Sequence, residues 1–323
     1  MFNTRAVHNL MPKKTIDKVD GKLRQIPFMV LALAVFFLPT PSLPFGSQEL
    51  YEFWQDKYVV PGTDGVLLDV HYLQTEESIV EEMFKLLDLR SGDVLYDLGC
   101  GDGIIVIRAV QKIGIHGVGI DLDPRRIAES KANAIAAQVA DKTTFLQQDL
   151  FQSDIKDATV VTLFLLDALN LKLRPKLFRE LRPGTRIVSH NFHMGDWKPD
   201  KKVSLGLRKD GFHNLFYWVL PANISGLWQG RYKEESWSLS IKQRFQRIEG
   251  SLMVNGKDTL QLSNATITGD VIRFATKSNE PDRSLTFEGK VAGHTIEGNF
   301  KGAVLTGGPW KAARNPATIS RIY

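Results

Sequence analysis

One loop of the sequence combines glycines and acids in a pattern that suits a cationic ligand. It reads Asp97-Leu98-Gly99-Cys100-Gly101-Asp102-Gly103 and lies between a short apolar strand pattern and a predicted helix at 104–110. The glycines allow a sharp turn and let a ligand approach the backbone closely. Their Gly-x-Gly-x-Gly spacing differs from the Gly-x-Gly-x-x-Gly pattern of dinucleotide sites. Because Asp97 and Asp102 flank the loop, we expect it to repel a phosphate and to favour a ligand with a positively charged end.

A further acid, Asp121, follows the next predicted strand at 117–120. A carboxylate at this position can accept hydrogen bonds from both hydroxyls of a ribose. The glycine loop, its flanking acids and Asp121 together fit an adenosine-bearing cation that has no phosphate. S-adenosylmethionine meets this description because it carries a sulfonium and an ammonium group. The alternative is a glycine-rich turn between a strand and a helix that binds no ligand.

Alternating helices and strands must position these residues. Thr75 is a predicted N-cap for a helix with apolar residues on one face, and Asp123 followed by Pro124 is another helix start. Further strands are predicted at 94–96, 143–146, 159–166 and 186–189, and a helix at 176–181. Such alternation indicates a parallel sheet with helices on both faces, a doubly wound α/β fold. Ligands of such sheets bind beyond the carboxyl ends of the strands.

Residues 94–149 resemble the class I S-adenosylmethionine-dependent methyltransferases. The loop from Asp97 to Gly103 matches their first motif, Asp121 their ribose-binding acid, and Asp149 the acid near the adenine amino group. The resemblance extends over roughly residues 48–221 and implies a doubly wound Rossmann-like methyltransferase sheet with S-adenosyl-L-methionine as cofactor. The cofactor contacts that it implies are Asp97, Gly99, Cys100, Gly101, Asp121 and Asp149.

More loosely, the same block is similar to bacterial relatives of the small membrane-linked protein-lysine methyltransferases of mitochondria, which act on the ADP/ATP carrier and on ATP synthase. The shared features are the glycine loop with its hydrophobic helix, a preceding segment that contains Tyr72, and a leading apolar segment. This resemblance implies N-methylation of a lysine in a protein acceptor. A small-molecule methyltransferase and a non-catalytic cofactor-binding scaffold are the alternatives.

Two observations argue against a nucleic-acid acceptor. Methylation of cytosine C5 needs a cysteine nucleophile, and the single cysteine, Cys100, lies inside the glycine loop. Methylation of exocyclic base amines typically uses an Asn/Asp-Pro-Pro-aromatic turn after the fourth strand, where this chain has Phe164-Leu165-Leu166-Asp167. The net charge of +5 gives no support either, since residues 1–26 contain six basic and two acidic residues and the rest of the chain 35 and 34.

The catalytic residue is not determined by the sequence. Methyl transfer mainly requires alignment of a deprotonated nucleophile and exclusion of water. Candidates lie where predicted strands end: Asp167 after the fourth strand, and His190 and Asp196 in the loop after the fifth. Alternatively, Asp167 is a helix cap and the loop is packed for structure around Trp197. No third ligand accompanies His190 and His193, so no metal site is expected.

The first 46 residues are expected to lie outside the fold. A basic leader precedes the apolar run 28–38, whose eleven residues are too few for the roughly 20 that a membrane-spanning helix needs. The pattern is typical of a signal or a short anchor. Because S-adenosylmethionine is made in the cytosol, we expect residues 26–39 to associate with the membrane interface and the body to face the cytosol. Export after signal cleavage is the alternative.

The pattern changes after Pro221, so residues 47–221 are the predicted methyltransferase domain. Beyond them, short alternating strands and glycine turns take over, and Asn255-Gly256 is a strong hairpin signal. We expect a small antiparallel β domain at 222–323, curled into a sandwich or an open barrel. It is predicted to fold independently and to contribute no cofactor contact.

Overall fold

The computed structural model describes residues 60–61, 67–68, 72–208, 211–277, 284–302 and 307–323. The predicted leader and anchor, residues 1–46, lie outside the described residues. Among the described residues, no helix combines the length and the apolar composition that crossing a membrane requires.

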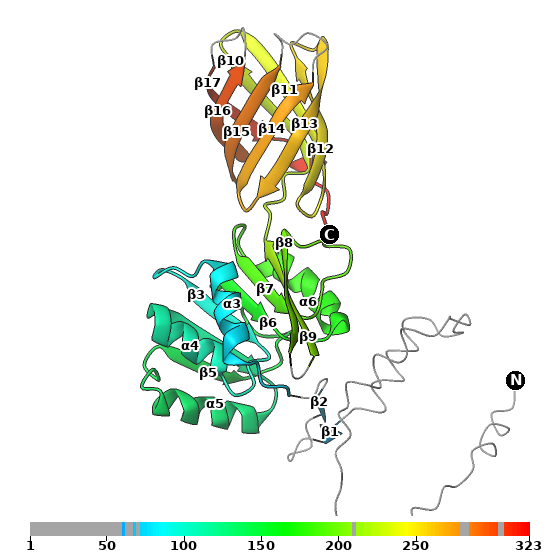
Figure 1. Cartoon of the computed structure of the whole chain (residues 1–323). Helices are drawn as coiled ribbons and strands as arrows, with labels where there is room; N and C mark the ends of the chain where they lie inside the picture. The colour runs from blue at the N-terminus through cyan, green and yellow to red at the C-terminus, as the bar shows by residue number, and fades with distance from the viewer. Residues whose placement is uncertain (1–59, 62–66, 69–71, 209–210, 278–283, 303–306) are drawn as a thin grey trace, which may run out of the picture. The chain divides into compact units, whose positions relative to one another are not determined.

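Seven strands form a mixed, Rossmann-like sheet (Figure 1). They are β3 (Val94–Leu98), β4 (His116–Asp121), β5 (Thr143–Gln147), β6 (Val160–Leu163), β7 (Arg186–His190), β8 (Lys201–Arg208) and β9 (Gly211–Val219), while β1 (Val60–Pro61) and β2 (Leu67–Leu68) pair separately. The order across the sheet is β5-β4-β3-β6-β7-β9-β8. Strands β3 to β7 are parallel, β9 is antiparallel to β7, and β8 is antiparallel to β9.

Helices cover both faces of this sheet. The apolar sides of α3 (Glu77–Leu87), α4 (Ile104–Ile113) and α5 (Pro124–Ala136) share one core with Leu95 and Val188. A second core joins α6 (Asp167–Glu180) to Val161, Ile187 and Trp218. Neighbouring residues of one strand, such as Ile187 and Val188, belong to different cores because side chains alternate across a strand. Two buried faces with helices on each confirm the Rossmann-like arrangement. The expectation of a purely parallel sheet is wrong, because β9 and β8 add an antiparallel hairpin at one edge.

Two local expectations are wrong, and one strand has no counterpart in the sequence prediction. The fourth strand ends at Leu163, since its pairing with β3 and β7 stops there, and α6 already begins at Asp167. Helix α3 starts at Glu77 with Glu76 as N-cap, so Thr75 is buried ahead of the helix and does not cap it. Strand β8 was not predicted, although Val203, Leu205 and Leu207 alternate along it.

The C-terminal strands form a closed antiparallel barrel. They are β10 (Gly226–Tyr232), β11 (Glu235–Arg244), β12 (Arg247–Val254), β13 (Asp258–Thr268), β14 (Val271–Lys277), β15 (Leu285–Ala292), β16 (Thr295–Gly302) and β17 (Gly308–Arg314), followed by the 3-10 helix η2 (Pro316–Thr318). Strand β17 pairs with β10, which corrects the expected sandwich or open barrel. Because the barrel is closed, β10 and β17 are each hydrogen-bonded to a neighbouring strand on both sides. The predicted hairpin is confirmed, because β12 and β13 pair antiparallel across Asn255 and Gly256, which both have a positive φ.

The barrel interior is packed with aromatic side chains. Trp228, Phe274, Phe287 and Phe300 are each at most 2% exposed. Phe274 stacks on Phe287 with ring centroids 4.6 Å apart. One barrel side chain, Phe245 in the turn after β11, instead joins the core beneath α6.

Candidate cofactor site

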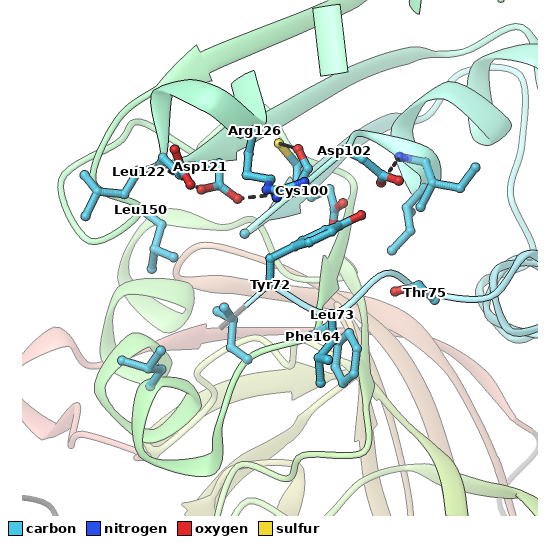
Figure 2. A pocket seen from close by; sticks show the side chains of 18 of the residues that line it. Tyr72, Leu73, Thr75, Cys100, Asp102, Asp121, Leu122, Arg126, Leu150 and Phe164 are labelled. Carbon is cyan, nitrogen blue, oxygen red and sulfur yellow. Dashed lines mark hydrogen bonds between the residues drawn. The ribbon is translucent and has the colours of Figure 1, made fainter. Parts of the chain in front are cut away.

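A pocket lies at the carboxyl edge of the parallel strands (Figure 2). Its wall combines the loop after β3, the end of β4, the turn after β5 and the segment after β6. In the part of the chain that the structure describes, its lining residues fall between Tyr72 and Leu169, and none of them comes from the barrel. The six residues predicted to contact the cofactor all line it: Asp97, Gly99, Cys100, Gly101, Asp121 and Asp149.

The glycine loop is held against the end of the neighbouring strand. The backbone N–H groups of Gly99 and Cys100 both donate to the carbonyl of Ile120, at 2.8 and 3.0 Å. Gly101 has a φ of +52°, and a Cβ there would lie 2.3 Å from the ring of Tyr72. A larger residue at Gly101 would therefore be strained and would collide with this ring. The sequence places glycine where the backbone must turn and another group approaches closely.

Asp121 connects this loop to the turn after β4. Its Oδ2 accepts from the N–H of Gly101 and its Oδ1 from the N–H of Asp123, both at 2.9 Å. Burial raises the pKa of Asp121 above its ordinary value, while these hydrogen bonds oppose the increase. The backbone N–H groups of Gly101, Leu122 and Asp123 donate to this carboxylate and fix its orientation.

Asp97 lies deeper, at 2% exposure, where its Oδ1 accepts from the hydroxyl of Thr162 at 2.7 Å. Burial raises the pKa of Asp97 to about 7, and the charges of Asp121 and Asp102 add to the increase. Among the described residues, neither Asp97 nor Asp121 has an ion pair with a basic side chain. Buried carboxylates without a cation favour a positively charged ligand. The donor set therefore fits S-adenosylmethionine, whose cation would offset this charge.

The remaining predicted contacts differ in character. Burial raises the pKa of the Cys100 thiol far above its usual range, which agrees with its exclusion as a nucleophile. Asp149 follows β5 and lines the pocket, and its Oδ1 accepts from the N–H of Phe151 at 2.8 Å. Apolar Leu122 and Leu150, each next in sequence to a predicted cofactor contact, also line the pocket, and such side chains suit a flat ring system.

The catalytic candidates are not brought together, and none of the three lines the pocket. His190 is buried, with its Nε2 2.8 Å from Nδ1 of His213, and its ring lies behind Phe164, centroid to centroid 4.1 Å. Asp167 is in the first turn of α6 and accepts from the N–H of His193 at 2.7 Å.

Asp196 is bound by two arginines, Arg244 of the barrel and Arg174 of α6, which hold the pKa of its carboxyl below the usual range. Trp197 beside it is fully buried against Trp218, so it acts as a core side chain in this structure. Within the described part of the chain, no group of three or more His, Cys, Asp or Glu residues is arranged to hold a metal ion.

Sequence reasoning did not assign several residues of the wall. Tyr72 was noted only for the resemblance that it carries, and Arg126 and Phe164 had no role. Arg126 lies in the first turn of α5, just after the Asp123-Pro124 start, and Phe164 directly follows β6. Their positions after strand ends were the available signal, because such positions meet at one edge of the sheet.

The chain is similar to several known methyltransferases. Residues 97–201 match the ANTKMT methyltransferase domain. The chain is 38% identical to a protein-lysine N-methyltransferase of Saccharolobus islandicus, over 47% of this chain and 94% of that protein. It is 32% identical to the adenine nucleotide translocase lysine N-methyltransferase of Mus musculus, over 43% of this chain and 60% of that protein. A crystal structure described as an RNA methyltransferase from Salinibacter ruber with S-adenosyl-L-homocysteine is 48% identical, over 47% of this chain and 96% of that one, with a TM-score of 0.44.

The mixed seven-stranded sheet and the acidic glycine-loop pocket define a Rossmann-like enzyme that takes its methyl group from S-adenosyl-L-methionine. The chain belongs to the class I S-adenosylmethionine-dependent methyltransferases and contains the ANTKMT methyltransferase domain of that class. It spans 60% of the length of the mouse relative, and the barrel strands lie beyond the matched residues 97–201.

Proposed function

We propose that the chain methylates the ε-amine of a lysine in a protein acceptor. The observation that carries this proposal is the 38% identity to a protein-lysine N-methyltransferase, 94% of which is covered. The matched domain and the name of the mouse relative support the same acceptor class.

The residues of the pocket have distinct parts in this reaction. Bound S-adenosylmethionine supplies a methyl group on a positively charged sulfur. Asp97, with the glycine loop, offsets that charge, Asp121 holds the ribose, and Asp149 lies at the adenine end. Phe164, Leu165 and Leu169 form an apolar wall of the pocket. Such a wall excludes water and favours the neutral form of a lysine amine, which is the form that can attack a methyl carbon.

Among the three catalytic candidates we retain Asp167. It lies in the chain between the pocket-lining Leu165 and Leu169, and its side chain is 44% exposed at this edge. Its contact with His193 leaves carboxylate lone pairs for an incoming amine. Asp196 forms ion pairs with two arginines, and the His190 ring packs behind Phe164. We therefore assign structural roles to Asp196 and His190.

A labelling experiment distinguishes the acceptor classes. The purified protein receives methyl-labelled S-adenosylmethionine together with a cell extract that includes membranes. We expect label in protein that is recovered as methyl-lysine after acid hydrolysis, and much less of it with Asp121→Ala when the cofactor is subsaturating. Label that ribonuclease removes, label that organic solvent extracts, or no transfer at all would replace the proposal with an RNA enzyme, a small-molecule enzyme or a non-catalytic scaffold, respectively.

We also propose that residues 26–39 hold the protein at a membrane, with the methyltransferase sheet on the cytosolic side. The support is the basic leader, the short apolar run and the need for a cofactor that is made in the cytosol.

A further inference from the structure

The ring of Tyr72 lies across the glycine loop although the side chain comes from the segment ahead of α3 (Figure 2). Its Cε2 would be 2.3 Å from a Cβ on Gly101, so the ring packs directly on this glycine. Tyr72 is 37% exposed and lines the pocket with Thr75, which is 7% exposed. Tyr72 to Thr75 therefore form one wall of the cofactor pocket.

Asp102 fastens this wall to the loop. The phenol of Tyr72 hydrogen-bonds to the Asp102 carboxylate. The side-chain amide of Gln74 donates to Oδ2 of Asp102 at 2.8 Å, and the N–H of Ile104 donates to Oδ1 at 3.1 Å. The Asp102 carboxylate, at the start of α4, thus holds the Tyr72 ring in place over the glycine loop.

A cation from the chain itself lies over the ring. The guanidinium carbon of Arg126 is 4.1 Å from the centroid of Tyr72, within the range of a cation–π interaction. Arg126 also pairs with Glu129 on its own helix, so it has an alternative partner one turn away. Arg126 and Tyr72 both line the pocket that contains Asp97, Asp102 and Asp121. The aromatic face and these acids together attract positive charge.

We propose that the ring of Tyr72 is a binding surface for the sulfonium of the cofactor, and that the guanidinium of Arg126 occupies this surface until the cofactor binds. Arg126 then pairs with Glu129 alone. S-adenosylmethionine carries a sulfonium charge, whereas the product S-adenosylhomocysteine is a neutral thioether at the same atom. The ring therefore favours the methyl donor, and Arg126 competes with the donor more strongly than with the product.

Calorimetric titration of the full chain with each ligand tests this pair. Tyr72→Leu is expected to weaken S-adenosylmethionine binding about threefold to tenfold and to leave S-adenosylhomocysteine almost unchanged. Tyr72→Phe keeps the ring and should retain most of the preference. Arg126→Met is expected to raise the preference for the donor. Arg179→Met removes an arginine that pairs with Glu180 on α6 and serves as the matched control.

A double variant distinguishes competition for the Tyr72 ring from simple charge repulsion between Arg126 and the cofactor. With Tyr72→Leu in place, Arg126→Met should no longer change the preference, because the surface for which both cations compete is gone. An equal gain in the presence and absence of the ring would overturn the proposal, as would equal loss of both ligands in Tyr72→Leu. Thermal melts establish that each variant folds. If Tyr72→Leu does not fold, the ligand preferences of Tyr72→Phe and Arg126→Met test the proposal.

Discussion

Oδ2 of Asp121 accepts a hydrogen bond from the backbone N–H of Gly101 at 2.9 Å, which joins the acid after β4 to the glycine loop after β3. This contact holds the carboxylate at the pocket in a fixed orientation before any ligand arrives. Preorganisation of this kind reduces the ordering cost of binding. Asp121 therefore both binds the ligand and holds the glycine loop in its conformation.

Replacing this acid is expected to weaken cofactor binding. A charge-assisted hydrogen bond contributes on the order of 1.5–3 kcal/mol, so Asp121→Ala should lower the affinity for S-adenosylmethionine at least about tenfold. Calorimetry measures the change directly. Asp141→Ala, at an exposed turn position before β5, is the control and should bind normally. Unchanged affinity in Asp121→Ala would refute the assignment of this residue to the ribose.

The raised pKa of Asp97 predicts a pH dependence of binding. As pH rises through about 7, this carboxyl loses its proton and gains the charge that a cationic ligand prefers. Affinity for S-adenosylmethionine should therefore increase between about pH 6 and pH 8. Asp97→Asn should bind more weakly and lose this part of the profile. A profile of the same shape in both proteins would contradict the prediction.

The same group affects the stability of the ligand-free protein in the opposite direction. Its pKa is raised from 3.8 to about 7, so the folded chain binds more protons than the unfolded chain between these values. The contribution of the neutral carboxyl to the free energy of unfolding is full below 3.8 and is lost as pH rises through about 7. Melting temperatures should therefore fall more steeply with pH in the wild type than in Asp97→Asn, and saturating cofactor should reduce the difference.

Removal of the barrel is expected to leave the cofactor site intact. Of the described residues, none beyond Leu169 lines the pocket, so a chain that ends at Pro221 should bind S-adenosylmethionine with roughly normal affinity. Its stability should fall because Phe245 and Tyr323 no longer cover Phe178 and Trp197. In the full chain, Phe245→Ala should cost about 3 kcal/mol of unfolding free energy without loss of binding. A folded, truncated protein that binds no cofactor would contradict this view.

Two aspartate variants separate catalysis from structure. Asp167→Asn is expected to lower kcat and to change the pH–rate profile, while cofactor affinity stays normal. Asp196→Asn weakens the ion pairs with Arg174 and Arg244 and should reduce thermal stability with little effect on kcat. If the Asp167→Asn variant methylated its acceptor at the wild-type rate, Asp167 would not be the general base.

Protease added to intact spheroplasts tests the location. We expect the methyltransferase domain to survive together with a cytosolic marker, because the proposed anchor keeps the body on the cytosolic side. Deletion of residues 1–46 should release the protein from the membrane fraction. Digestion of the domain while the marker survives would indicate export instead.

The sequence alone determined the features that depend on short windows of chain. The alternation of helix and strand, the glycine loop with Asp121 after the next strand, and the change of pattern at Pro221 were all readable, because periodicity and turn chemistry are local. The Asn255-Gly256 turn was predictable for the same reason. These features led to the Rossmann-like sheet, the cofactor and six of the residues that line its pocket.

Only the tertiary structure decided which distant residues meet. Closure of the barrel depends on pairing between β10 and β17, the first and the last of its strands, which no local pattern encodes. Asp196 looked like a site residue, yet packing turned it toward Arg244 of the barrel. Tyr72 reached Gly101 because long-range burial brings the segment ahead of α3 over the glycine loop. Local chemistry specifies the elements, whereas the burial of their apolar faces selects which side chains share a pocket.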